Sequence, residues 1–350
     1  MRMTVLASGS KGNSTVIASS RTCVLVDAGL SCRELLRRMA LAGEDPAELD
    51  AILITHEHQD HIAGLAVLAR RLKIPVFLTE PTHRAWVRML TPRTTMTYAK
   101  WLDHIQQEKE ARAAVVADAV AYDLAAERAS IAHVSAEAAA LDSALNQTRA
   151  IYAGADPTGS DEEIEESCDP DEAQAAPQKS DPTHLPAVEY FHAGTNFSIG
   201  DIDITPFTIP HDAADPCGFV FEAEGIRMAL ATDLGYMPPN VKAALKRIDV
   251  LLLESNHDLE MLRDGPYPWS VKQRVLSRVG HLSNEAMATF LEKDYDGGAS
   301  WIVLGHLSES NNAPELARLC AEQALSGHPT LLGNRILLAG QTAPLDSIHL

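Results

Sequence analysis

Residues 55–61 read Thr-His-Glu-His-Gln-Asp-His, and this stretch constrains the fold more than any other part of the chain. It follows an apolar run, residues 51–54, that is typical of a buried strand. Imidazole nitrogens and carboxylate oxygens are ligands that zinc, manganese and iron accept in proteins. The pattern therefore predicts a metal site just after a strand, rather than a polar turn whose histidines face water. The four candidate ligands are His56, His58, Asp60 and His61.

The composition indicates a globular protein with a substantial core. The chain has 350 residues, of which 46% are hydrophobic, and its mean hydropathy is -0.09. That length is enough for one large domain or two. No apolar run reaches membrane-spanning length, and residues 1–6 are typical of a short strand rather than a signal peptide. The five cysteines include no Cys-x-x-Cys pair, which favours reduced thiols in a cytoplasm over a disulfide framework.

The net charge of -19 argues against indiscriminate binding to polyanions, but this charge is unevenly spread. Residues 102–188 contain 18 acidic and 5 basic side chains, so they carry -13 of the total. Within them, residues 106–149 are rich in Ala, Glu and Arg and predict one or two helices. Residues 156–186 mix acidic residues with Pro, Gly and Ser, which predicts a disordered linker. We interpret 102–188 as a solvated insertion, with a partner-binding or regulatory helix pair as the alternative.

Strand-like and helix-like runs alternate outside this insertion. Ser31 and Glu34 have the spacing of a capping box, and Glu224-Gly225 suits a tight turn between two strands. The expected strands are 4–7, 15–18, 23–27, 51–54, 75–78, 202–207, 218–223, 228–232, 250–254 and 301–304. The expected helices are 31–41, 65–72, 242–247, 284–292 and 313–325. Two successive sets of strands with interleaved helices predict a layered α/β sandwich.

Further candidate ligands follow other expected strands. One histidine cluster supplies too few ligands for two metal ions, so the remainder must come from distant parts of the chain. His211, Asp233, His257 and His306 each stand at or just after the end of an expected strand. Any one of them alone is equally consistent with a surface or turn residue. Together they predict a single active-site edge.

Eight segments, in order along the chain, carry a family resemblance. They are 8–14, 27–31, 52–64, 210–214, 231–235, 254–258, 280–284 and 306–312. Residues 56–61 fit His-x-His-x-Asp-His, the signature of the metallo-β-lactamase superfamily, and the whole set resembles its YycJ/WalJ-type branch. The resemblance implies a four-layer αββα sandwich with two metals at one edge. Residues 1–101 would form its first half and 189–350 its second, with 102–188 inserted between them.

The resemblance also implies which residues bind each metal. One metal would take His56, His58 and His211, the other would take Asp60, His61 and His306, and Asp233 would bridge both. Zinc is favoured by the many imidazoles, while the two carboxylates leave manganese as the alternative. Two divalent ions can hold a hydroxide nucleophile between them at neutral pH and offset charge on a phosphoryl oxygen. Asp60 would then act both as ligand and as orienter of the nucleophile.

The leaving oxygen needs a proton, and two histidines are candidate donors. His281 lies in Gly-His-Leu-Ser-Asn, which looks like the Gly-His-Ser-Thr element of RNase Z relatives, although this loop could instead cap a helix. His257 could donate a proton, contact substrate or orient a ligand. We expect Asp27 to brace the metal loop by hydrogen bonding rather than to bind metal. Cys217 is interpreted as a packed thiol.

The resemblance implies a 5′-to-3′ exonuclease on double-stranded DNA that acts in repair. Arg263, Lys272, Arg274 and Arg278 could follow a phosphate backbone, although such residues are often only solvated charge. The acidic insertion would repel nucleic acid unless it is held away, and it could recruit a protein partner. The alternatives are a phosphodiesterase acting on RNA ends or a small phosphorylated molecule, a glyoxalase-type thioester hydrolase, and a non-catalytic scaffold. The sequence favours a cytoplasmic, dinuclear-metal phosphodiesterase with DNA as substrate.

Overall fold

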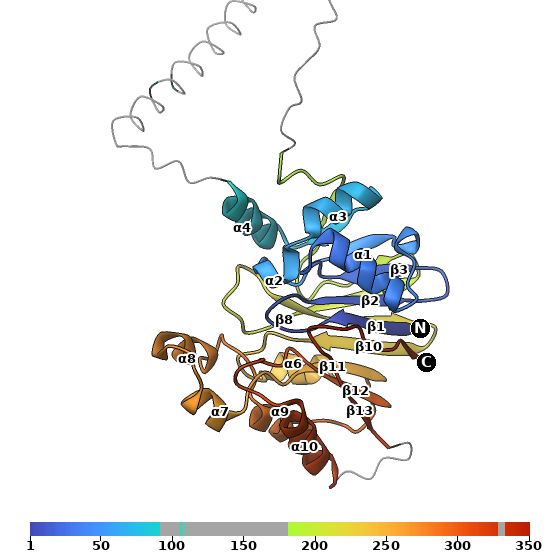
Figure 1. The fold of residues 1–350 in the computed structure, drawn as a ribbon. Helices are drawn as coiled ribbons and strands as arrows, with labels where there is room; N and C mark the ends of the chain where they lie inside the picture. The colour runs from blue at the N-terminus through green and yellow to red at the C-terminus, as the bar shows by residue number, and fades with distance from the viewer. Residues whose placement is uncertain (92–105, 107–108, 110–180, 328–332) are drawn as a thin grey trace, which may run out of the picture. The chain divides into compact units, whose positions relative to one another are not determined.

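The computed structural model describes residues 1–91, 106, 109, 181–327 and 333–350 (Figure 1). The described residues within Met1–Pro92 and Lys179–Leu350 belong to one unit. Most of the predicted helical part of the insertion and most of the predicted disordered linker lie outside the described residues. Residues 181–186 of that linker are described, and there Thr183 donates to the Asp181 carboxylate and Leu185 is buried. At the predicted end of the insertion, Val188 is already the first residue of a strand. None of the described helices combines the length and apolar character that crossing a membrane requires.

Two mixed sheets form the centre of this unit. The first has the strand order β14 (Ile348–His349), β1 (Arg2–Ala7), β2 (Ser14–Ala18), β3 (Cys23–Val26), β4 (Ala51–Leu53), β5 (Val76–Leu78) and β6 (Val188–Tyr190). The second has the order β13 (Arg335–Leu338), β12 (Trp301–Gly305), β11 (Val250–Glu254), β10 (Ile226–Ala231), β9 (Cys217–Ala223), β8 (Ile202–Thr208) and β7 (Phe197–Ile199). Strands β3 to β6 run parallel to one another, as do β10 to β13.

The helices cover the outer faces of the two sheets. Beside the first sheet lie α1 (Cys32–Leu41), α2 (Gln59–Ile62), α3 (Leu65–Leu72) and α4 (Glu80–Leu90) (Figure 1). Beside the second lie α6 (Pro239–Ala244), α9 (Asn284–Lys293) and α10 (Pro314–Leu325), with α7 (Leu259–Asp264) and α8 (Trp269–Val275) at its end. This confirms the predicted αββα sandwich.

Three clusters of buried apolar side chains hold the layers together. The central one joins the inner faces of both sheets and contains Phe219 and Phe221, neither of which is exposed. The second packs α1, α3 and α4 against the first sheet, and the third packs α6, α9 and α10 against the other. Burial of a side chain of this size contributes about 1.5–3 kcal/mol, so the central cluster fixes the two sheets face to face.

Most expected elements are present with ends shifted by one or two residues. Ser31 caps α1, and its Oγ accepts a hydrogen bond from the Glu34 N–H. Glu224 and Gly225 have φ of 55° and 75°, so they form the predicted tight turn. The helix expected at 242–247 instead begins at Pro239, because proline is well suited to the first turn of a helix.

Gly29 lies where the first sheet meets the loop that contains Asp60. Its N–H donates to the Asn13 carbonyl, and a Cβ at this position would overlap the carbonyl oxygen of Asp60. We expect Gly29→Ala to lower the free energy of unfolding by about 1–3 kcal/mol, because backbone must shift to make room. The control is Gly327→Ala, since a Cβ at Gly327 would meet no described heavy atom within 4 Å. Equal urea midpoints for the two variants would contradict this packing.

Candidate metal centre

The candidate site lies where the carboxyl ends of the strands in both sheets meet. Asp27 and His306 directly follow β3 and β12, Asp233 follows β10 after one intervening residue, and their φ angles are 61°, 56° and 63°, respectively. Such left-handed backbone is uncommon outside glycine, although aspartate and histidine adopt it more readily than most residues. Each instance costs about 1–3 kcal/mol. The chain therefore turns sharply at three strand ends that supply polar side chains to one point.

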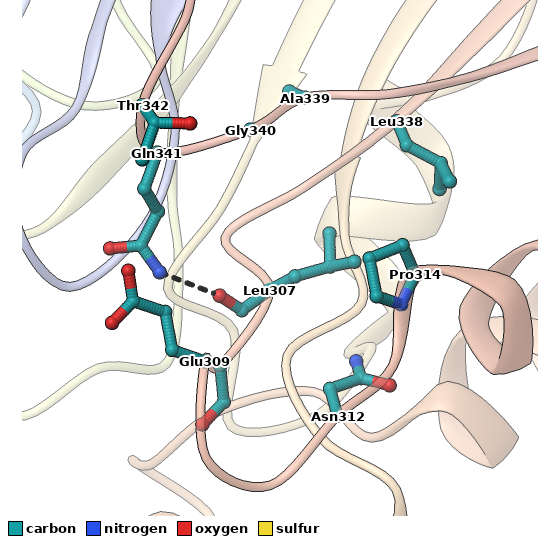
Figure 2. Close-up of a pocket in the computed structure, with 10 residues that line it drawn as sticks. Leu307, Glu309, Asn312, Pro314, Leu338, Ala339, Gly340, Gln341 and Thr342 are labelled. Atoms are coloured by element: carbon teal, nitrogen blue, oxygen red, sulfur yellow. Dashed lines mark hydrogen bonds between the residues drawn. The ribbon is translucent and has the colours of Figure 1, made fainter.

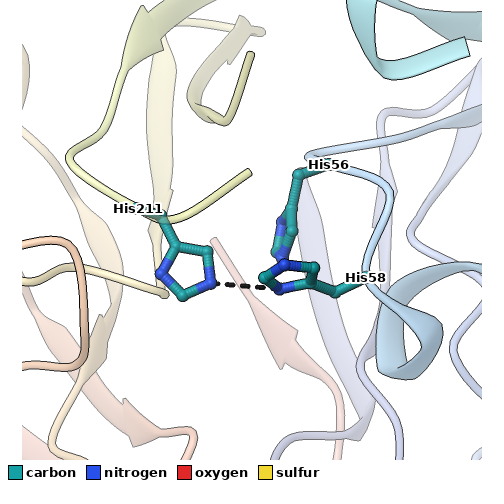
Figure 3. Close-up of side chains that lie close together, drawn as sticks. All are labelled: His56, His58 and His211. Atoms are coloured by element: carbon teal, nitrogen blue, oxygen red, sulfur yellow. Dashed lines mark hydrogen bonds between the residues drawn. The ribbon is translucent and has the colours of Figure 1, made fainter. Parts of the chain in front are cut away.

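Three histidines from both halves of the sandwich come together at this point (Figure 3). The ligand atoms of His56, His58 and His211 lie within 4.8 Å of one another, and His211 Nε2 is 3.2 Å from His58 Nδ1. His211 Nδ1 lies 3.1 Å from the Gly280 carbonyl oxygen, to which it donates. That hydrogen bond leaves Nε2 without a proton in the neutral ring, which is the form that binds metal.

A second group combines Asp60, His61 and His306, whose ligand atoms also lie within 4.8 Å of one another. Asp60 Oδ2 is 3.5 Å from His61 Nε2 and 3.6 Å from His306 Nε2. Asp233 lies between the two groups, because its Oδ2 is 3.4 Å from His61 Nε2 and its Oδ1 is 3.8 Å from His211 Nε2. The structure thus brings together all seven residues that the resemblance implies as ligands.

Asp27 holds the loop of residues 55–61 in place by hydrogen bonds. Its carboxylate accepts hydrogen bonds from the backbone N–H of Thr55 at 2.9 Å and from His61 Nδ1 at 2.8 Å. The Thr55 hydroxyl donates to the same carboxylate. Because Nδ1 of His61 is occupied, its Nε2 turns toward Asp60 and Asp233. The predicted bracing role of Asp27 is confirmed.

Glu254 braces the opposite side of the site, a role that was not predicted from its sequence context. Its Oε1 lies 2.9 Å from His306 Nδ1 and 2.8 Å from His281 Nδ1, while its Oε2 accepts from the N–H groups of Leu234 and Leu282. Burial raises the pKa of Glu254, but the contacts with His281 and His306 outweigh burial and hold it below the ordinary value. Glu254 is the last residue of β11, and four other site residues also stand at or just after strand ends. That position was the sequence feature from which its role could have been predicted.

The glycine-rich loop between β1 and β2 supports the ligands as well. Asn13 Nδ2 donates to Asp60 Oδ2 at 3.1 Å, and Ser8 Oγ accepts from the N–H of His306 at 2.8 Å. Glu57 joins the two halves, since its Oε1 accepts from the N–H of Ala214 at 2.8 Å. The loop between β1 and β2 therefore positions ligand residues of the site through Asn13 and Ser8.

Buried polar atoms without partners test whether the site fits a metal. Among the described residues, His56 Nε2, Asp233 Oδ2 and His306 Nε2 are buried and have no hydrogen-bond partner. Leaving such atoms unsatisfied costs several kcal/mol in total, at about 1–3 kcal/mol each. All three belong to the groups described above, and a cation coordinated by nitrogen and carboxylate oxygen would satisfy them. The residues present therefore fit a divalent metal.

The charges of the ligands also suit a cation. Burial lowers the pKa of His56 well below its ordinary value, so its ring is neutral and able to bind metal. Burial alone would also lower the pKa of His61, but Asp27, Asp233 and Asp60 raise it to about 9. Burial would raise the pKa of Asp60, yet the neighbouring His61 and His306 hold it below its ordinary range. The pKa values of the Asp60 and Asp233 carboxylates are both lowered by neighbouring histidines despite burial, so both are ionised and carry negative charge that a bound cation would balance.

A cavity of about 180 Å³ opens onto this site. His281 lies in its wall with a side chain that is 19% exposed, whereas His257 is 1% exposed and does not line it. Burial lowers the pKa of His257 to about 4. The carbonyl of His257 accepts from the N–H of Asn284. Ser283, in the same loop as His281, caps α9, because its Oγ accepts from the N–H of Ala286, so this loop also has the predicted helix-capping role. The structure therefore places His281 in the wall of the cavity, whereas His257 is buried and does not line it.

A larger cavity of about 420 Å³ lies on the other side of the loop that follows His306 (Figure 2). Ser308 lines both cavities. In the wall of the larger cavity, Gln341 Nε2 donates a hydrogen bond to the Leu307 carbonyl at 3.1 Å, which joins the C-terminal segment to the loop after His306. The loop that carries His306 is thus packed between the metal site and the C-terminal segment.

Cys217, at the start of β9, takes no part in the metal groups. It is fully buried, and its Sγ lies 3.6 Å from the Asp215 carbonyl oxygen. Burial raises the pKa of its thiol to about 12, so it stays protonated. The interpretation of Cys217 as a packed thiol is confirmed.

Comparison with known proteins places this arrangement in a family. Residues 7–110 match the metallo-beta-lactamase superfamily, and residues 157–306 match a beta-lactamase superfamily domain. The chain belongs to the metallo-β-lactamase superfamily. It is similar to exodeoxyribonuclease WalJ of Streptococcus pneumoniae, with 30% identity over 91% of this chain and 86% of the relative. Exodeoxyribonuclease YycJ of Bacillus anthracis is also 30% identical, over 93% of this chain and 89% of the relative.

Solved structures share the superfamily fold at low sequence identity. YhfI from Bacillus subtilis aligns with a TM-score of 0.54 and 12% identity, covering 99% of each chain. PqqB from Methylobacterium extorquens aligns with a TM-score of 0.54 and 14% identity, covering 99% of this chain and 100% of that one. The fold, the ligand groups and the WalJ/YycJ relatives together make this superfamily member a metal-dependent hydrolase.

Removing the carboxylate of Glu254 tests its bracing role. We expect Glu254→Gln to weaken zinc binding about 10–100-fold, because the rings of His306 and His281 lose their common partner. Competition with a zinc-binding dye measures the affinity. Glu260→Gln, an exposed change on α7, is the control and should bind zinc as the wild type does. Wild-type affinity in Glu254→Gln would show that the ligands hold their geometry without this bond.

Proposed function

We propose that this protein is a dinuclear-metal phosphodiesterase that acts on double-stranded DNA as a 5′-to-3′ exonuclease in cytoplasmic DNA repair. The observation that carries the proposal is the clustering of seven ligand-type residues, four of which line one cavity together with His281. The names of the WalJ and YycJ relatives support DNA as the substrate.

Two sets of residues would hold the metals, with Asp233 between them. The first set is His56, His58 and His211, and the second is Asp60, His61 and His306. Zinc is the expected metal because imidazole nitrogens dominate, and manganese is the alternative because two carboxylates contribute. Bound divalent ions would generate hydroxide at neutral pH and stabilise negative charge on the phosphate.

The residues around the metals then position the substrate and move a proton. His281 lies in the cavity wall, and its Nδ1 is held by Glu254, so its Nε2 is the atom that would donate a proton to the leaving oxygen. The Glu254 carboxylate fixes the orientation of this ring. His257 takes no part in these steps, because it is 1% exposed and does not line the cavity. Arg274 lines the cavity, paired with Asp212, and places positive charge beside the phosphate.

The size of the cavity supports a second candidate function, a phosphodiesterase that acts on RNA ends or on a small phosphodiester. A volume of about 180 Å³ admits a single phosphodiester group and its neighbours, so a strand end fits better than the middle of a duplex. RNA ends or a small phosphodiester would fit the same space. The predicted insertion 102–188 remains a candidate docking segment for a protein partner.

Cleavage assays on end-labelled polymers test the proposed function. We expect the metal-loaded protein to release nucleotides from the 5′ end of duplex DNA, with little action from the 3′ end or on RNA. A chelator should abolish the activity, and zinc or manganese should restore it. Asp60→Ala should lower the rate at least 10²-fold, because it removes a ligand and the orienting carboxylate.

The control variant is Asp203→Ala, which changes an exposed aspartate on β8. It should cleave DNA at the wild-type rate. Cleavage of RNA or a small diester without cleavage of DNA would replace the DNA assignment with the second candidate. Metal-independent cleavage by Asp60→Ala would contradict the proposed mechanism.

A further inference from the structure

We propose that α8 and the turns that flank it form a strand-binding surface, on which Trp269 stacks against an unpaired base of the nucleic-acid substrate. This inference rests on the proposed function, because it assumes a polymer whose end enters the metal cavity. It adds a binding element that lies outside the cavity itself.

The helix α8 lies on the surface of the protein. None of its residues is buried, and the Trp269 side chain is 67% exposed. Leu276 and Val279, which follow the helix, are 50% and 43% exposed. A large aromatic side chain left in water beside an active site is typical of a binding contact, because its burial contributes to affinity only when a partner is present.

The same helix forms part of the cavity wall. Tyr267, just before α8, and Arg274 and Val275, near its end, line the metal cavity together with His281. Trp269 and Arg274 are five residues apart, which corresponds to about 7.5 Å along the helix axis and about 140° around it, so their side chains leave α8 in different directions. A strand whose scissile phosphate lies in the cavity would therefore reach Trp269 by leaving past Tyr267, the cavity-lining residue two positions before it.

The charge on this segment suits a nucleic acid. Residues 265–280 contain three basic side chains and no acidic one, in a chain whose net charge is -19. Within the described parts of the chain, neither Lys272 nor Arg278 forms an ion pair with a carboxylate, and Lys272 Nζ donates only to the Arg263 carbonyl. The Arg278 guanidinium lies over the Tyr236 ring, 4.2 Å from its centroid, which leaves a flat cationic surface.

An exposed indole on a basic segment matches how proteins hold single strands. Bases of every sequence present a π-face, so stacking on an aromatic side chain is tolerant of sequence, and nearby cations neutralise the phosphates. This strand-binding surface would hold the frayed end of the cleaved strand or the displaced complementary strand. Its main effect is therefore on KM for a polymer, since Trp269 does not touch the reacting phosphate.

Variants at Trp269 separate stacking from general apolar contact. W269F keeps an aromatic ring, W269L keeps apolar area without one, and W269A removes both. We expect W269A and W269L to raise KM about tenfold for a labelled oligonucleotide duplex with a frayed 5′ end, with a much smaller effect on hydrolysis of bis(4-nitrophenyl) phosphate. W269F should stay within about threefold of wild type. The control Leu319→Ala, at a 48% exposed position on α10, should change neither substrate.

Binding in the presence of a chelator distinguishes this proposal from the proposed function. Fluorescence anisotropy with a labelled single strand should show weaker binding by W269A and W269L than by wild type and W269F. If that pattern appears without cleavage of any polymer, the strand-binding surface is supported and the exonuclease assignment is wrong. Equal binding by wild type and W269A would overturn the strand-binding surface. A shift from dimer to monomer in W269A, with unchanged oligonucleotide KM, would instead make this surface an interface between two copies.

Discussion

The metal centre depends on two buried carboxylates that fix the orientation of histidine rings from opposite sides. Asp27, at the end of β3 in the first sheet, holds His61, and Glu254, at the end of β11 in the second, holds His306 and His281. Both carboxylates are almost fully buried, so each would be costly without its histidine partner. One brace comes from each sheet, and the site therefore forms only when the two sheets pack face to face.

That packing explains why strained backbone is tolerated at the site. Asp27, Asp233 and His306 adopt left-handed conformations at strand ends, and each is held by contacts that reach beyond its own loop. The N–H of His306 donates to Ser8, which lies in the opposite sheet's first connection. The apolar cluster between the sheets, which includes Phe219 and Phe221, supplies the burial that offsets this strain. Stability of the sandwich and geometry of the metal site are thus linked.

The sequence was informative where local chemistry decides structure. Apolar runs predicted the central strands to within one or two residues, and the capping residue Ser31 and the turn at Glu224 followed from their side chains and spacing. The edge strands β6, β7, β13 and β14 escaped prediction because each has four residues or fewer and its place depends on pairing with one neighbouring strand. The helix α8 escaped because no residue of it is buried, so it has no apolar face to detect.

The pattern of a strand followed by a ligand-type residue predicted the candidate site residues. It could not show which of these candidates take part in the site. His257 and Glu254 stand close together at the end of β11, and only the fold shows that Glu254 reaches His306 while His257 stays outside the cavity. Residue type and spacing predict candidates, whereas side-chain direction depends on contacts between the two sheets. The same limit applies to Trp269, whose exposure no sequence pattern reveals.

The most direct test of a two-metal centre is a crystal structure with anomalous diffraction data collected above and below the zinc absorption edge. The account predicts two peaks per chain, one beside His56, His58 and His211 and one beside Asp60, His61 and His306, with Asp233 in contact with both. The first peak alone should disappear in His211→Ala crystals. A single peak in the wild type, or peaks away from these residues, would contradict the account.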